Sequence, residues 1–251
     1  PGPTPIPSGE FPSLGVFGVT PEAAADLGVE WTRQPLRWSI VEPSKGNFRW
    51  KDIDEILQER QGQDIKVVVT LRLEAPWATN CGTARAACFP ENEQDLRDFV
   101  SALASRYKNE EIYWQIENEP YAYPYVTRFW DDSMQNLVKA MKISSEEIRK
   151  ADPDALIVMP GIAAGNLVGQ GLVVSEENLL YVMENGRDYF DAIDVHLYRR
   201  TEDVPERISQ VKEMMAKTGN SGKLIFSTEN AIQFSNPTPT QEQQAQDIPK
   251  R

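Results

Sequence analysis

The chain has 251 residues, of which 40% are hydrophobic, and its formal net charge at pH 7 is −12. This length fits one compact domain and is also about the usual size of a complete eight-fold (β/α) barrel. An acidic chain excludes nucleic-acid binding, which needs a basic face, and the absence of an apolar run of roughly 18 residues excludes a membrane span.

The first ten residues predict an extended lead-in rather than part of a core. Residues 1–9 contain four prolines, which stiffen the backbone and resemble the mature start or linker of an exported protein. We therefore expect a lead-in at 1–10 and a single folded domain at 11–251.

Seven short apolar runs without strict alternation follow, as expected for parallel strands that are buried on both faces. They lie at 14–18, 30–36, 65–71, 112–116, 156–159, 192–195 and 224–227. Amphipathic segments between them predict helices at 52–60, 133–150 and 205–217, and a further helix that carries Leu96, Phe99, Val100, Leu103 and Tyr107. This alternation predicts an α/β fold with a parallel sheet.

Two architectures fit that pattern. A doubly wound sheet usually carries a glycine-rich turn after its first strand, and residues 15–20, Gly-Val-Phe-Gly-Val-Thr, lack that motif. The sequence therefore favours a (β/α)8 TIM-type barrel, truncated after the seventh strand, because only the Gln-rich segment 241–246 precedes Arg251. We expect a second fragment or chain to complete the barrel, since open edges of a buried sheet are a liability.

The only two cysteines, Cys81 and Cys88, are spaced for a small disulfide-closed loop. The alternative is a metal-binding pair, but no other Cys or His lies nearby to complete such a site. A disulfide implies an oxidising compartment, so the expected location is secreted or extracytoplasmic.

Two glutamates stand where a barrel places its chemistry, at the carboxyl ends of strands. Residues 116–120, Ile-Glu-Asn-Glu-Pro, end the fourth run and contain Glu119, while Glu229 ends the seventh. A charge directly after a buried strand is costly unless it has a partner or a role. Retaining hydrolysis of a glycosidic bond needs two carboxyl groups about 5–5.5 Å apart. Glu117 is a rival to Glu119 for the acid.

These motifs resemble the clan A glycoside hydrolases. The resemblance rests on Asn-Glu-Pro at 118–120 and Thr-Glu at 228–229, and extends to Ala-Pro-Trp at 75–77 and His-Leu-Tyr at 196–198. Arg33, followed by Trp38, Glu42, Gly46 and Trp50, looks like the second βα unit of families 39, 42 and 5. Members of these families close the barrel with an eighth strand that often carries an aromatic platform, and this chain departs from them there.

The resemblance implies that Glu119 is the general acid/base and Glu229 the nucleophile. Asn118 would bind the sugar 2-hydroxyl, and Arg33 would keep Glu229 ionised. An ordinary structural ion pair is the alternative for Arg33.

The resemblance also implies that His196 and Tyr198 line the same site, with the Tyr198 hydroxyl close to the nucleophile. A buried core residue is the alternative for His196.

Sugars stack on aromatic rings, so Trp77, Trp38 and Tyr121 are candidate subsite walls. Trp38 could equally fill the core.

The sequence thus predicts a retaining glycoside hydrolase that acts on an oligo- or polysaccharide and needs neither a metal nor an organic cofactor. A non-catalytic carbohydrate-binding barrel is the alternative. A metal-dependent hydrolase would need several histidine ligands, and the chain has one histidine.

Overall fold

The computed structural model describes residues 15–26, 28–59, 65–81, 86–121, 129–163, 175–198 and 201–231. The strands in these ranges pair in parallel in the order β1-β2-β3-β4-β5-β7-β6, and β8 and β9 both pair with β7. Their bounds are β1 Gly15–Phe17, β2 Trp31–Arg37, β3 Lys66–Arg72, β4 Ile112–Ile116, β5 Ile157–Val158, β6 Ile162–Ala163, β7 Ala192–Tyr198, β8 Leu224–Phe226 and β9 Asn230–Ala231.

Each of the seven predicted runs forms a strand, so the predicted parallel sheet is confirmed. β6 and β9 continue the paths of β5 and β8 after an interruption, and both continuations pair with β7. The result is a curled half-barrel of seven strands, consistent with a truncated TIM barrel. Residues 1–14 and 232–251, which hold the lead-in and the Gln-rich segment, lie outside the described residues.

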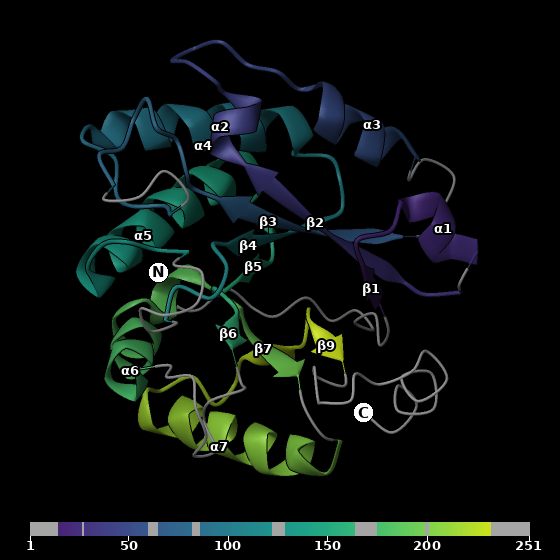
Figure 1. The fold of residues 1–251 in the computed structure, drawn as a ribbon, viewed down its shortest axis with the longest axis vertical. Helices are drawn as coiled ribbons and strands as arrows, with labels where there is room; N and C mark the ends of the chain where they lie inside the picture. Colours follow the sequence, from purple (N-terminus) through teal and green to yellow (C-terminus); the bar gives the residue numbers. More distant parts are fainter. Residues whose placement is uncertain are drawn as a thin grey trace, which may run out of the picture.

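Helices surround the curved sheet, with α4 and α5 on one side and α6 and α7 next to β7 (Figure 1). Their bounds are α1 Pro21–Asp26, α2 Trp38–Val41, α3 Lys51–Glu59, α4 Glu93–Tyr107, α5 Met134–Ala151, α6 Glu176–Asn185 and α7 Val204–Lys217, with short 3-10 turns η2 Arg187–Tyr189 and η3 Thr201–Asp203. Asn92, Ser133 and Ser175 start α4, α5 and α6 as N-caps whose side chains accept a backbone N–H. None of the described helices is long and apolar enough to cross a membrane.

The inside of the half-barrel changes from apolar to polar along the strands. Val158 and Ala192 form a small apolar cluster with Tyr113 and Phe226. Because side chains alternate along a strand, the next inward positions after Tyr113 and Ala192 are Gln115 and Asp194. The carboxyl end of the sheet is therefore the place where buried polar groups must find partners.

Candidate active site

Three polar side chains of β7 face the inside of the half-barrel. Asp194, His196 and Tyr198 stand at every second position of the strand, so the alternation of a strand brings them to one face. Asp194 and His196 are completely buried. The sequence named His196 and Tyr198 but missed Asp194, which the same two-residue spacing would have revealed.

Both neighbours of β7 carry one extra residue opposite this row. Val158 pairs with Ala192 and Ile162 with Val195, so an advance of four residues matches three on β7. On the other side, Phe226 pairs with Asp194 and Asn230 with Leu197, again four residues against three. The extra residues lie in 159–161 and 227–229, and they interrupt the ladder as a bulge does. Glu229 therefore belongs to an irregular segment rather than to a regular strand.

Gly161, in the first of these irregular segments, makes room for the histidine ring. A Cβ at this position would lie 2.4 Å from Nε2 of His196 and 3.1 Å from Oδ2 of Asp194. Any side chain here would displace the buried pair, so glycine is required by close approach.

The two candidate glutamates approach the same histidine. Nδ1 of His196 lies 2.6 Å from Oε1 of Glu119 and 3.6 Å from Oε2 of Glu229. One carboxylate oxygen of each glutamate and a ring nitrogen of His196 all lie within 4.8 Å of one another. The two glutamate side chains keep 18% and 15% of their surface exposed, so both can be reached from solvent.

Glu229 is held by two further donors. Nη1 of Arg33 donates to its Oε1 atom, and the Tyr198 hydroxyl donates to its Oε2 atom. Burial alone would raise the pKa of Glu229, but the charges of His196 and Arg33 and these hydrogen bonds outweigh it and lower the pKa. Glu229 is therefore held as a carboxylate.

Arg33 on β2 is a buried hub that joins β3, β4 with the residues directly after it, and the segment between β8 and β9. Its guanidinium donates to Oγ1 of Thr70 at 2.8 Å, to Oε1 of Gln115 at 2.8 Å and to Oδ1 of Asn118 at 2.7 Å, as well as to Glu229. The planar guanidinium presents its N–H groups in a fixed geometry, so each of these four acceptors receives a hydrogen bond. Thr70 and Gln115 were not named from the sequence, because a Thr and a Gln inside an apolar run carry no distinctive signal.

The partners of His196 favour its protonated form. Burial lowers its pKa, but the charge of Asp194 and hydrogen bonds to Asp194 and Glu119 outweigh burial and raise the pKa to about 10. The pKa of Tyr198 is also raised, first by burial and then by its bond to Glu229, so the phenol keeps its proton as a donor.

Glu117 has a different set of partners from Glu119. Its carboxylate is fully buried, lies 3.0 Å from Nε of Arg72 and accepts the backbone N–H groups of Leu73 and Asn118. Both glutamates have positive φ, 65° at Glu117 and 41° at Glu119, a region that non-glycine residues rarely adopt. This turn after β4 separates the two carboxylates, so Glu117 lies among structural partners while Glu119 meets His196.

The profile of the family described as cellulase (glycosyl hydrolase family 5) matches residues 20–248 of this chain. The chain belongs to this family. Its structure is also similar to solved glycoside hydrolases at low identity, which bears on the fold alone.

The similar structures come from several glycoside hydrolase families. A family 39 glycoside hydrolase from Bacteroides cellulosilyticus has a TM-score of 0.68 and 18% identity, and the match covers 93% of this chain and 51% of that one. A glucosidase from Croceicoccus marinus has a TM-score of 0.69 and 12% identity, covering 91% and 53%. The xylanase XynB from Paenibacillus barcinonensis has a TM-score of 0.61 and 16% identity, covering 97% and 80%. This family 5 chain spans about half the length of the first two.

The aromatic residues predicted as subsite walls differ in placement. Trp38 is completely buried, stacks on Phe99 at 5.0 Å and donates from Nε1 to Glu42, so it occupies the core, the alternative that the sequence left open. Trp77 keeps partial exposure and donates from Nε1 to the carbonyl of Glu42. Tyr121 is 2% exposed, and burial raises the pKa of its phenol. Of these three residues, Trp77 alone keeps partial exposure.

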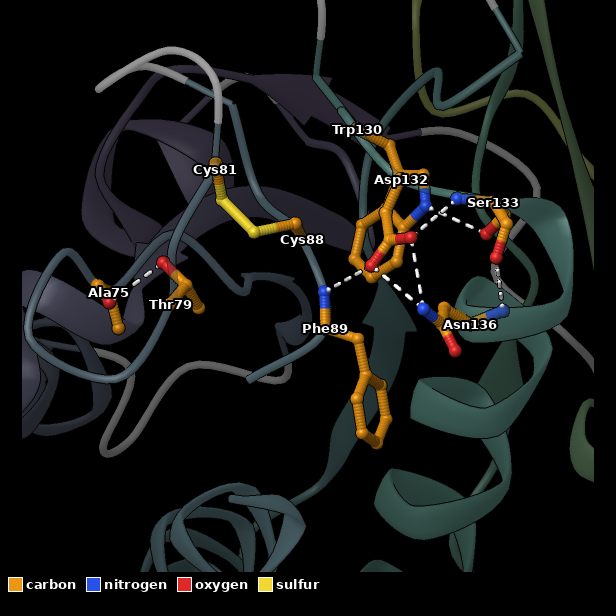
Figure 2. Close-up of a disulfide and its surroundings, with 9 residues drawn as sticks. All are labelled: Ala75, Thr79, Cys81, Cys88, Phe89, Trp130, Asp132, Ser133 and Asn136. Carbon is orange, nitrogen blue, oxygen red and sulfur yellow. Dashed lines mark hydrogen bonds between the residues drawn. A yellow bond between two sulfur atoms is a disulfide. The ribbon is translucent and has the colours of Figure 1, made fainter. Parts of the chain in front are cut away.

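The predicted disulfide between Cys81 and Cys88 is confirmed, with a Cα–Cα distance of 5.7 Å (Figure 2). The loop that it closes is attached to the start of α5, because the backbone N–H of Phe89 donates to Oδ2 of Asp132 at 3.0 Å. Asp132 also accepts from Asn136 in the first turn of that helix. The loops after β3 and β4 are thus joined at the mouth of the half-barrel.

Glu119, His196 and Glu229 are close enough to share a metal ion. Their facing atoms are engaged by protein donors, however: His196 contacts Glu119, and Arg33 and Tyr198 donate to Glu229. A charged imidazolium is a donor and not a metal ligand. The arrangement therefore fits a hydrogen-bonded carboxylate pair better than a set of metal ligands.

Proposed function

We propose that the chain is a retaining glycoside hydrolase that cleaves an oligo- or polysaccharide, with Glu119 as general acid/base and Glu229 as nucleophile. The observation that carries this proposal is the approach of the two glutamates to one histidine, with carboxylate oxygens within 4.8 Å. Retaining enzymes place their carboxyl groups about 5–5.5 Å apart, whereas inverting enzymes need roughly 6.5–9.5 Å to admit a water molecule.

The partners of each glutamate support its assigned role. Glu229, fixed by Arg33 and Tyr198, is suited to attack the anomeric carbon, because it is ionised and oriented by two donors. Glu119 then protonates the leaving oxygen in the first step and takes a proton from water in the second. When the glycosyl ester forms, Glu229 loses its negative charge, and Arg33 and Tyr198 no longer donate to a carboxylate.

The other predicted residues complete the proposed site. Asn118, held by Arg33 through Oδ1, keeps its side-chain NH₂ group free of that bond and suited to a sugar hydroxyl. Trp77 is proposed as a subsite wall. We also propose an extracytoplasmic location, because disulfides persist in oxidising compartments.

Two variants test the roles of the glutamates. Glu229→Ala should abolish turnover of every substrate, since no glycosyl-enzyme can form without the nucleophile. Glu119→Ala should still react with aryl glycosides whose leaving groups need no protonation, and its stalled intermediate should be released by azide. On a β-glycoside the product is then a β-glycosyl azide.

Azide rescue of Glu229→Ala with an α-glycosyl azide would reverse the two assignments. Unchanged turnover in both variants would end the assignment of the two glutamates. A complete lack of turnover in the unmodified chain would leave the carbohydrate-binding barrel, which binding of a polysaccharide panel by that chain would then test.

A further inference from the structure

The mechanism above gives no role to Asp194, a buried ionised group next to the candidate site. Asp194 is completely buried inside the half-barrel, two residues before His196 on β7. A carboxylate in such a place costs several kcal/mol unless its charge is compensated. Its partners therefore indicate what it does.

The Asp194 carboxylate receives four donors. Its Oδ2 atom lies 3.0 Å from Nε2 of His196 and accepts from the Thr228 hydroxyl at 2.6 Å and from Nε2 of Gln115. Its Oδ1 atom accepts the backbone N–H of Thr228 at 2.8 Å. Asp194 thus binds both the histidine that faces Glu119 and the residue directly before Glu229.

The surroundings of His196 place a carboxyl group against each of its two ring nitrogens. Nε2 faces Asp194 and Nδ1 faces Glu119, with Glu229 at 3.6 Å. A neutral imidazole has one donor nitrogen, so one of these carboxylates would then face a lone pair. Its other described neighbours are the Thr228 hydroxyl at 3.4 Å from Nε2, the ring of Tyr198 at 6.4 Å and the backbone at Gly161, and none of them carries a positive charge.

We propose that Asp194 is a positioning residue that holds His196 as an imidazolium between the two glutamates and fixes the segment carrying Glu229 through Thr228. The catalytic roles of the two glutamates rest on the proposed function, but the charge and orientation of His196 do not depend on it.

A count of charges shows what this arrangement achieves. Three carboxylates, on Glu119, Glu229 and Asp194, face two cations, on Arg33 and His196. The cluster becomes neutral when one proton is added to the glutamate pair, and Glu229 is the carboxylate held by Arg33 and Tyr198. Of the two cations, Arg33 contacts Glu229, whereas His196 faces both glutamates and Asp194.

The single histidine of the chain makes a direct test possible. In protein labelled with 15N-histidine, every imidazole signal belongs to His196, and the two nitrogens report which of them carries a proton. At pH 8 the unmodified chain should show both nitrogens protonated, with a titration midpoint near 10 rather than at the ordinary 6.5. A midpoint near 6.5 would overturn the proposal without any variant.

The matched variants are Asp194→Asn and Thr228→Val. Asp194→Asn keeps the shape but can place an NH₂ group against Nε2, so His196 should become neutral at pH 8 with its proton on Nδ1. Thr228→Val removes one donor to Asp194 but leaves its charge, so His196 should stay charged. An unchanged midpoint in Asp194→Asn, or loss of the charge in both variants, would contradict a role for the Asp194 charge.

The titration and the turnover assay fail separately. If Glu119→Ala and Glu229→Ala leave turnover unchanged while His196 titrates near 10, the catalytic proposal fails and the Asp194 inference stands. If the glutamate variants behave as expected and His196 titrates near 6.5, the opposite holds.

Discussion

Arg33 on β2 donates a hydrogen bond to Glu229, which lies 196 residues later in the chain, and both side chains are largely buried. The same guanidinium also serves Thr70, Gln115 and Asn118. A lysine would bring the charge but not the fork that satisfies these neighbours together.

Arg33→Lys should therefore lower kcat/KM by roughly tenfold to a hundredfold, because a hydrogen bond to a charged group contributes about 1.5–3 kcal/mol and tenfold in rate is about 1.4 kcal/mol. Steady-state kinetics on an aryl glycoside measures this effect. The control is Arg106→Lys on α4, which changes the exposed ion pair of Arg106 with Asp54. Equal rates in both variants would make Arg33 an ordinary structural ion pair.

Trp38 and Trp77 contact each other at 5.5 Å, yet their substitutions should differ. Trp38→Ala should lower the free energy of unfolding by about 3–5 kcal/mol, because it leaves a large cavity in the core. Trp77→Ala should cost less stability and should raise KM for an oligosaccharide if its exposed face binds sugar. Urea denaturation and substrate kinetics on both variants separate the effects, and an unchanged KM in Trp77→Ala would remove it from the proposed site.

The disulfide should stabilise the folded chain modestly, since Cys81 and Cys88 are only seven positions apart. Loop-closure entropy gives about 2.5 kcal/mol for a ring of this size. The double substitution of both cysteines by alanine should lower the free energy of unfolding by that amount in denaturant titrations. Reductant should lower the free energy of unfolding of the unmodified chain to that of the variant and should not change the value for the variant. A further decrease in the reduced variant would show that reductant acts on something other than this disulfide.

Glu117 should make stability depend on pH. Burial raises its pKa from 4.5 to about 7, against the opposing charge of Arg72, so the folded state keeps a proton that the unfolded state has already released. The contribution of Glu117 to stability is then fully present below pH 4.5 and is lost as pH rises to about 7, a change on the order of 3 kcal/mol.

Glu117→Gln provides the comparison, because glutamine does not titrate. The free energy of unfolding of the unmodified chain minus that of the variant should fall between pH 4.5 and pH 8, measured by urea denaturation. A constant difference across this range would show that Arg72 keeps Glu117 ionised throughout.

The sequence predicted the strands well, because parallel strands buried on both faces read as apolar runs. It placed the end of the sixth strand at 195, whereas β7 continues to Tyr198. The strand extends into the polar part of the half-barrel, where His196 and Tyr198 end the apolar run without ending the strand. Hydropathy predicts burial among apolar groups, but it does not predict the burial of polar residues within a hydrogen-bonded network.

Other features needed three-dimensional information. α6 was not predicted, although Ser175 caps it. The burial of Trp38 depends on Phe99, 61 positions later, and a local pattern cannot supply such a contact. The alternation of side chains along a strand could not show that Glu117 and Glu119 have different partners, because both residues have positive φ and the alternation ends there.

The extra residues on both sides of β7 make the length of these segments a constraint in its own right. In a regular ladder, removing one residue exchanges the two faces for everything that follows. Here the ladder carries one extra residue, so a chain shortened by one residue within 227–228 would instead regain an even match with β7 and would place Glu229 opposite His196 in a regular strand, without the irregular segment that now presents it. Relatives of this chain could therefore vary in side chains along this segment much more freely than in its number of residues.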